Sequence, residues 1–219
     1  MKLLIVAATK SEVEILVSRL KFISIDTNNV SRFSSEKCIV DILITSVGMV
    51  ATAFELGRRL QNNIYDLILN VGICGAINKQ LSIGEVVNVT TDCIYELGAE
   101  DGDKFLKFEE LNLPGKNKFE NILESKNEII RSLRKVSGIT VNTVHGNDTS
   151  ISKIESRIKS DVETMEGAAF MYAMENQATP YFQIRSISNY VERRDRSKWN
   201  ILLAIKNLNE ELLNIIHSL

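Results

Sequence analysis

The chain has 219 residues, of which 44% are hydrophobic and 25% are charged, and its formal net charge is −2. No basic surplus indicates a nucleic-acid partner, and no apolar run is long enough to predict a membrane span. The apolar N-terminal run meets Lys10, Glu12 and Glu14 at once, so it predicts a first strand rather than a signal peptide. Three cysteines without metal-type spacing indicate a reduced, cytoplasmic protein.

Apolar runs and helix-period segments alternate along the chain. Its first part predicts, in order, a strand at Leu3–Ala8, a helix at Glu12–Leu20, a strand at Cys38–Thr45, a helix after Gly48, and strands at Asp66–Val71 and Gly84–Thr90. Its second part predicts a polar loop or excursion at Gly98–Lys118, a helix at Lys126–Lys135, a strand at Ile139–Thr143, a helix at Ile151–Ile158, a strand at Val162–Thr164, a helix from Met165, a strand at Pro180–Ile187 and a helix at Lys198–Ile216.

This alternation predicts an α/β fold with a mostly parallel sheet covered on both faces, as one domain over residues 1–219. The helix after Gly48 is expected to place Val50, Ala51, Phe54, Leu56 and Leu60 inside. Such sheets bind ligands at the carboxyl ends of their strands. The search for a site therefore starts at the strand ends, which are Ala8, Thr45, Gly72, Thr143 and Ile187.

Two acidic residues follow predicted strand ends. Glu166 lies where the pattern changes to a helix, and the small Gly167, Ala168 and Ala169 predict close backbone packing there. Its carboxylate can either accept hydrogen bonds from neighbouring hydroxyls or only complement the helix dipole, and the stretch alone favours neither. Glu12 can take a proton from water, or it can be an ordinary acid at a helix start.

Polar residues also follow the strand Pro180–Ile187. The amide of Asn189 can read the edge of a purine, and Arg194 and Arg196 can clamp a carboxylate. A solvated turn with mutually paired charges is the competing interpretation, which the segment by itself favours. The segment from Gly72 to Ala76 and the turn at Gly48 contain glycines but match no dinucleotide or phosphate-loop pattern, so both are interpreted as contacts to a neutral ring.

Other chemistries have little support in the sequence. The chain has only two histidines, His145 and His217, which excludes a histidine-rich metal centre, and it has no GxSxG elbow. His145 is expected to order its loop rather than act as a base. We therefore predict neither a metal nor a cofactor.

Four motifs occur in an order that resembles the nucleoside phosphorylase/nucleosidase superfamily. They are Lys2-Leu-Leu-Ile-Val-Ala-Ala with Glu12, Asn70-Val-Gly-Ile-Cys-Gly75, Val162-Glu-Thr-Met-Glu166 and Arg185-Ser-Ile-Ser-Asn189. Within it, Met165 to Phe170 and Ile187 to Arg196 most resemble the futalosine hydrolases, next to the methylthioadenosine/S-adenosylhomocysteine nucleosidases. The resemblance implies a three-layer fold around a twisted mixed sheet, a homodimer, and a purine nucleoside and water as substrates.

The resemblance also implies roles for individual residues. Glu12 activates the attacking water, Glu166 binds the ribose hydroxyls, and Asn189 stands where adenine-directed nucleosidases carry an aspartate. The remaining predicted substrate-binding residues are Met165 against sugar and base, Cys74, Gly75 and Ser188 near the purine, and Arg194 for the benzoate tail of futalosine. Arg193 stands where the family pattern has a proline, so the path of this loop departs from that pattern.

The Asn189 departure has a chemical meaning. Asn can give both amide protons to N7 and O6 of hypoxanthine, whereas a protonated Asp would set its acceptor oxygen against O6. A buried unmatched pair costs about 1–3 kcal/mol. The resemblance thus favours hydrolysis of futalosine to hypoxanthine in menaquinone biosynthesis. The alternatives are methylthioadenosine/S-adenosylhomocysteine cleavage, purine nucleoside phosphorolysis, and nucleoside binding without catalysis.

Overall fold

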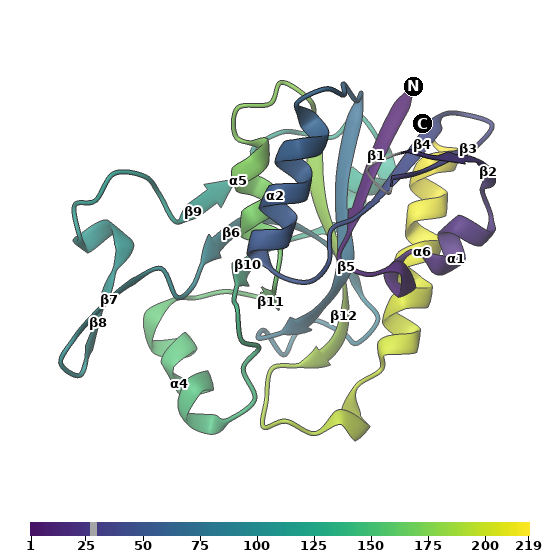
Figure 1. Cartoon of the computed structure of the whole chain (residues 1–219). Helices are drawn as coiled ribbons and strands as arrows, with labels where there is room; N and C mark the ends of the chain where they lie inside the picture. Colours follow the sequence, from purple (N-terminus) through teal and green to yellow (C-terminus); the bar gives the residue numbers. More distant parts are fainter. Residues whose placement is uncertain (27–29) are drawn as a thin grey trace.

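Strands and helices alternate along most of the chain (Figure 1). The computed structural model describes residues 1–26 and 30–219. The strands are β1 (Lys2–Ala7), β2 (Lys21–Ile25), β3 (Ser31–Ser34), β4 (Ile39–Ile44), β5 (Leu67–Ala76), β6 (Val86–Ile94), β7 (Gly98–Asp101), β8 (Lys104–Lys107), β9 (Lys118–Glu120), β10 (Arg134–Thr140), β11 (Val162–Thr164) and β12 (Tyr181–Tyr190). The helices are α1 (Glu14–Ser18), α2 (Met49–Leu60), α3 (Glu128–Ser132), α4 (Asp148–Arg157), α5 (Gly167–Met174) and α6 (Ile201–His217), with 3-10 turns η1 (Lys10–Glu12), η2 (Phe108–Glu110) and η3 (Arg196–Lys198).

The main sheet is mixed. Its strand order is β11-β10-β6-β12-β5-β1-β4-β3-β2, with β9 beside β6. Pairs β1–β4, β1–β5, β5–β12, β6–β10 and β10–β11 are parallel. Pairs β2–β3, β3–β4, β5–β11, β6–β9 and β6–β12 are antiparallel, so the predicted parallel majority is not confirmed.

A second pairing of β11 brings distant parts of the chain together. β11 hydrogen-bonds to β5 as well as to β10, which closes β5, β12, β6, β10 and β11 into a ring. The register sets Glu163 opposite Gly75 and Val162 opposite Ala76. This closure carries the start of α5 to the carboxyl end of β5, where the sequence predicted a ligand.

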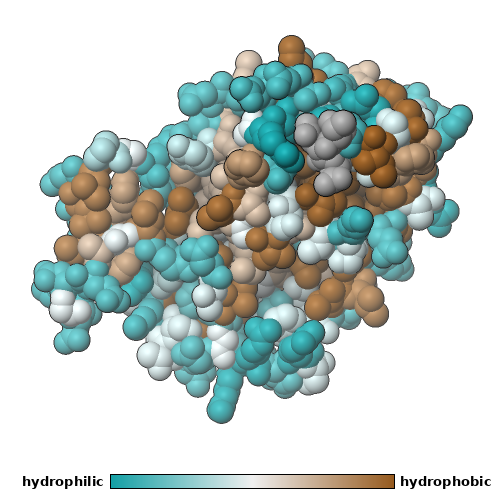
Figure 2. All heavy atoms as spheres, in the orientation of Figure 1, coloured by the Kyte–Doolittle hydropathy of each residue, from teal (hydrophilic) through white to brown (hydrophobic). Residues whose placement is uncertain are grey.

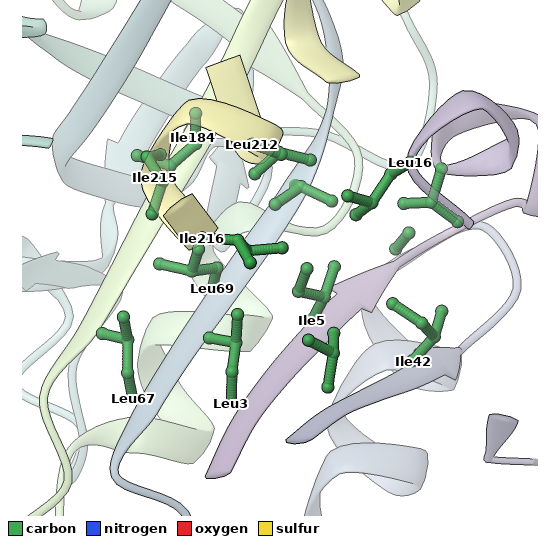
Figure 3. Close-up of a cluster of buried hydrophobic side chains, with 14 of the residues drawn as sticks. Leu3, Ile5, Leu16, Ile42, Leu67, Leu69, Ile184, Leu212, Ile215 and Ile216 are labelled. Atoms are coloured by element: carbon green, nitrogen blue, oxygen red, sulfur yellow. The ribbon is translucent and has the colours of Figure 1, made fainter. Parts of the chain in front are cut away.

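Helices cover both faces of the central strands, which explains the continuous apolar sequence of β1. On one face Leu3 and Ile5 belong to a buried cluster with Leu212, Ile215 and Ile216 of α6 (Figure 3). On the other face the alternate residues Leu4 and Val6 belong to a cluster with side chains of α2 and α5, among them Leu56 and Phe170. The two-residue period of the strand thus divides one apolar run between two cores.

Helix α5 packs as closely as its small residues predict. A Cβ added at Gly167 would lie 2.1 Å from Oδ2 of Asp92 and 2.4 Å from Nε2 of Gln183. Glu166, however, is the N-cap of α5 and not a residue of its first turn, so its side chain is free to point away from the helix. The helix begins two residues later than the pattern predicts.

Several expected elements differ in length or kind. β5 continues through Gly72 to Ala76, so this segment is a strand and not a turn. Likewise β12 extends past Ile187 and includes Asn189, which was expected beyond the strand end. The added backbone pairing, β5 with β12 on one side and with β11 on the other, stabilises both extensions.

The N-terminal third holds further differences. The predicted helix Glu12–Leu20 is the turn η1 followed by the short α1, and β2 and β3 were not predicted. On α2, Val50 and Phe54 are 83% and 65% exposed, contrary to the prediction that they lie inside. The helix buries Leu56 as predicted and also buries Thr52 and Arg59, of which Arg59 reaches a buried acid on β4.

The excursion predicted at Gly98–Lys118 contains the hairpin β7–β8 and the turn η2. The hairpin extends away from the body of the molecule (Figure 1), and its surface mixes hydrophobic and hydrophilic side chains (Figure 2). Among the described helices, none combines the length and the apolar character that crossing a bilayer requires.

Candidate active site

A hollow of about 420 Å³ opens at the carboxyl ends of β5 and β12, bounded by β11 and by the segment after β1. The eight residues predicted to form a site all line it, namely Glu12, Cys74, Gly75, Met165, Glu166, Ser188, Asn189 and Arg194. The structure therefore brings together residues that lie up to 182 positions apart in the chain, from Glu12 to Arg194. Their individual roles stay predictions.

Glu12 is buried, with 7% of the residue exposed. Its Oε2 accepts hydrogen bonds from the backbone N–H and the hydroxyl of Thr9 at 2.9 and 3.1 Å, and its Oε1 accepts from the N–H of Ile73 at 3.2 Å. These donors fix the carboxylate at the wall of the hollow. A fixed carboxylate that borders a water-sized space is suited to general-base chemistry.

Glu166, at the start of α5, borders the same hollow and is 6% exposed. Its Oε1 accepts a hydrogen bond from the N–H of Gly48 at 3.1 Å, and Oε2 lies 3.5 Å from Nη1 of Arg185. Burial raises the pKa of Glu166, and the charge of Glu12 raises it further, while Arg185 and the Gly48 N–H act in the opposite direction. The Gly48 turn, with φ of 101°, thus contacts an acid, and its predicted contact to a neutral ring stays a prediction.

Arg185 contacts Glu166 but was not among the predicted site residues, although it begins one of the four motifs. Its side chain is 1% exposed, and its Nη2 donates to Oδ1 of Asn70 at 2.5 Å. A Cβ at Gly72 would lie 2.4 Å from Nη1 of Arg185 and 2.6 Å from Oε1 of Glu12. The glycine is therefore needed so that one cation can lie next to both carboxylates. A charged residue in the middle of a predicted central strand was the available signal.

Asn189 and Gly75 form the other end of the hollow. They are paired in register, and a bulge at Ser188 turns the Asn189 side chain toward Gly75, whose added Cβ would lie 3.4 Å from Nδ2. The hydroxyl of Ser188 lies 2.8 Å from Oδ1 of Asn189 and 3.1 Å from the carbonyl of Cys74. Nδ2 of Asn189 donates to the carbonyl of Tyr190 at 3.0 Å. One amide proton is thus engaged with the protein, so donation of both protons to a purine, as predicted, requires release of the Tyr190 carbonyl.

Cys74 and Met165 give this end of the hollow an apolar wall. Burial raises the pKa of the Cys74 thiol to about 12, so it is neutral and a poor nucleophile. Met165, between β11 and α5, is half-buried and lines the hollow. Both residues can contact a flat ring without competing for its hydrogen bonds.

Arg194 lies at the rim. Its backbone N–H donates to the carbonyl of Gly146 at 2.9 Å, and its guanidinium lies 5.0 Å from the ring centroid of Trp199. The stacking holds a cation beside an aromatic surface, an arrangement that can receive an aromatic carboxylate. Arg196, the other arginine considered, does not line the hollow.

The chemistry of the hollow is that of acids, an amide and apolar walls. Within residues 1–26 and 30–219, no group of three or more His, Cys, Asp and Glu side chains is arranged to hold a metal ion. One carboxylate can deprotonate water and a second can accept hydrogen bonds from sugar hydroxyls. The remaining amide proton of Asn189 can stabilise charge on a departing base.

Comparisons with known proteins identify the family of this chain. Residues 2–218 match the family model described as the phosphorylase superfamily. The chain is similar to a futalosine hydrolase from Acidothermus cellulolyticus, with 32% identity over 177 residues that cover 77% of this chain and 71% of that protein. It is also similar to a 5′-methylthioadenosine/S-adenosylhomocysteine nucleosidase from Buchnera aphidicola, with 26% identity covering 98% of this chain and 89% of that protein.

A solved structure extends the likeness in fold. The native futalosine hydrolase of Helicobacter pylori strain 26695 matches over 100% of this chain and 98% of its own, with a TM-score of 0.84 and 16% identity. At this identity the comparison establishes the fold. Because the family model spans almost the whole sequence and a relative above 30% identity covers most of it, the chain belongs to the phosphorylase superfamily.

Proposed function

We propose that this protein hydrolyses the N-glycosidic bond of a purine nucleoside, and that its substrate is futalosine, which yields hypoxanthine and dehypoxanthine futalosine. The observation that carries the proposal is that Glu12 and Glu166 border one hollow whose far end holds the amide of Asn189. The 32% sequence identity to a futalosine hydrolase, in an alignment that covers 77% of this chain, supports the same reaction.

The proposed reaction assigns a role to each acid. Glu12 takes a proton from water as the oxygen attacks the anomeric carbon, and the bond from that carbon to the purine nitrogen breaks with its electron pair on the base. The sugar has oxocarbenium character in the transition state, so Glu166, hydrogen-bonded to the ribose hydroxyls, favours it electrostatically. Arg185 counters the repulsion between the two carboxylates.

Asn189 stabilises the base as it leaves. Its remaining amide proton can reach N7 or O6 of hypoxanthine, while its oxygen is turned to Ser188. Since an amide cannot transfer a proton, the arrangement suits a base that departs as an anion and is protonated afterwards. Adenine also offers N7 as an acceptor, so Asn189 by itself does not exclude it.

The tail of the substrate completes the proposal. Futalosine carries a benzoate on its sugar, and the guanidinium of Arg194 over Trp199 is the candidate partner for that carboxylate. We therefore place the reaction in menaquinone biosynthesis. A nucleoside without the benzoate should bind less tightly because this ion pair is absent.

We further propose a three-layer fold, a homodimer and a cytoplasmic location. Core clusters on both faces of the sheet support the layers, and three buried free cysteines support a reducing compartment. Val50 and Phe54 of α2, Tyr172 of α5 and Val47 at the hollow are all more than half exposed, which supports association through this face. Phe54→Glu should shift the particle mass measured by light scattering from dimer to monomer.

The reaction is tested by following the released base from futalosine, aminofutalosine, methylthioadenosine and inosine, each with and without phosphate. We expect futalosine to have the highest kcat/KM and phosphate to have no effect. A steep rise with phosphate would instead indicate a phosphorylase. Preference for methylthioadenosine would favour the activity of the Buchnera relative, and binding without any cleavage would indicate a non-catalytic protein.

A further inference from the structure

His145 and Glu163 form a buried pair in the hollow that the proposed reaction does not use. The backbone N–H of His145 donates to Oε1 of Glu163 at 3.0 Å, and Nδ1 of the same histidine contacts Oε2. The two side chains are 10% and 3% exposed, and both residues line the hollow. The histidine ring also packs edge-on against Tyr95, with centroids 5.3 Å apart. Packing and hydrogen bonds together hold the imidazole in one orientation.

The pair lies beside the proposed base position. Across β5, Gly75 is in register with Glu163 on one side and with Asn189 on the other. Residues that pair directly across strands point to the same face of a sheet. A glycine therefore lies between the His145–Glu163 pair and the Asn189 amide, and all of these residues line the hollow, so a purine there can present its edge to both.

The hydrogen bonds of the pair determine which atom remains for a ligand. Each oxygen of Glu163 contacts a nitrogen of His145, and a carboxylate accepts but does not donate. The proton between the two side chains is therefore on Nδ1, and in the neutral imidazole Nε2 then carries a lone pair. Among the described residues the ring of His145 hydrogen-bonds through Nδ1 and not through Nε2, and the residue lines the hollow.

We propose that Nε2 of His145 accepts a hydrogen bond from N1–H of a 6-oxopurine and that Glu163 is the positioning residue that fixes this tautomer. The inference rests on the proposed function and deepens it. A 6-oxopurine has a proton on N1, whereas a 6-aminopurine has a lone pair there that would face the lone pair of His145. Asn189 accepts either base, so the histidine supplies the discrimination that the amide lacks.

The test measures the binding of the free bases hypoxanthine and adenine by calorimetry, which requires no turnover. The wild-type chain should bind hypoxanthine more tightly. His145→Phe keeps the ring packing but has no acceptor, so the ratio of the two affinities should fall roughly 10- to 100-fold. His145→Gln, whose amide oxygen can accept from N1–H, should restore part of the preference.

Glu163→Gln tests the positioning role. An amide no longer requires the proton on Nδ1, so the preference for hypoxanthine should fall even though His145 is present. His217→Phe, at the end of α6 and outside the hollow, is the matched control and should bind both bases as the wild type does.

Three outcomes would overturn the proposal: equal binding of the two bases by the wild type, an unchanged ratio in His145→Phe, or a parallel loss of both affinities in a folded His145→Phe protein. Failure of the proposed function has a different signature. In that case no nucleoside is cleaved, while the difference between hypoxanthine and adenine binding persists.

Discussion

Two clusters of buried charge lie on either side of β1, and they differ in how completely their acids are paired. On β4, Asp41 is fully buried and accepts hydrogen bonds from Arg32 at 2.7 and 3.0 Å, from Arg59 at 2.7 Å and from the hydroxyl of Tyr65 at 2.9 Å. Burial opposes its ionisation, but these hydrogen bonds hold the pKa of Asp41 below its usual range.

The second cluster has two acids, Glu12 and Glu166, and one arginine, Arg185. Both acids border the hollow, and burial raises the pKa of Glu166 instead of being outweighed. Asp41 is paired with two arginines and does not line the hollow, so it holds β3, β4 and α2 together. A buried acid with room beside it can act on another molecule. We therefore assign Asp41 a scaffold role and propose a chemical role for Glu12 and Glu166.

The largest effect is expected for Glu12→Gln. Loss of the general base should lower kcat by about 10²- to 10⁴-fold, while hypoxanthine binding measured by calorimetry stays within a few-fold of wild type. Glu14→Gln, an exposed neighbour at the start of α1, is the control and should turn over normally. Undiminished turnover by Glu12→Gln would contradict the role of Glu12 as general base.

Asp41→Asn should have the opposite profile. Removing the charge leaves Arg59, which is 4% exposed, without its buried partner, and such losses destabilise by about 3–5 kcal/mol. Urea unfolding should show this loss, whereas kcat/KM of the protein that remains folded should match the wild type. Asp101→Asn in the exposed β7–β8 hairpin should change neither quantity. A stable but inactive Asp41→Asn variant would show that Asp41 contributes to the reaction and not only to stability.

A third buried acid, Asp92, sharpens the comparison because its hydrogen-bond partners are neutral. Thr140 and Gln183 each donate to it at 2.9 Å, and burial raises its pKa from 3.8 to about 6. Between these pH values the folded state binds more protons than the unfolded state, so stability falls as pH rises, by about 3 kcal/mol in all. Asp92→Asn should remove this slope in chemical unfolding measured from pH 4 to 7.

Asp161 provides the control of opposite sign. Burial works against its ionisation, but hydrogen bonds from Ser137 and Asn78 keep its pKa below the usual 3.8. Its contribution to stability is present above that pH and is lost as the pH falls through the lowered pKa. Asp161→Asn should therefore destabilise the protein at neutral pH. If Asp92→Asn and Asp161→Asn changed the free energy of unfolding in the same way across this pH range, the opposite signs assigned to the two acids would be wrong.

The smallest effect is expected at Ser188. Ser188→Ala removes the hydroxyl next to Asn189 Oδ1. The lost hydrogen bond contributes about 0.5–1.5 kcal/mol to holding the amide in place, so kcat/KM should fall a few-fold. Ser186→Ala on the same strand is the control. Its buried hydroxyl has no partner among the described residues, so its removal should leave the kinetics unchanged.

The sequence predicted many of the residues that line the site but few of the contacts between them. The ordered motifs were enough to name Glu12, Glu166 and Asn189, and all three line one hollow. Arg185 was missed because its importance comes from contacts with Asn70 and Glu166, which lie on other elements. The engaged amide proton of Asn189 was missed for the same reason, since it depends on the path of β12 through Tyr190.

By itself the sequence determined the alternation of strands and helices, because hydrophobic periodicity and small residues act over a few neighbouring positions. The tertiary structure alone decided the mixed sheet, the closure of β11 onto β5 and the row of Glu163, Gly75 and Asn189. These features depend on the register between strands that lie far apart in the chain. Register is selected by the burial of whole faces and by backbone hydrogen bonds, which no local pattern encodes.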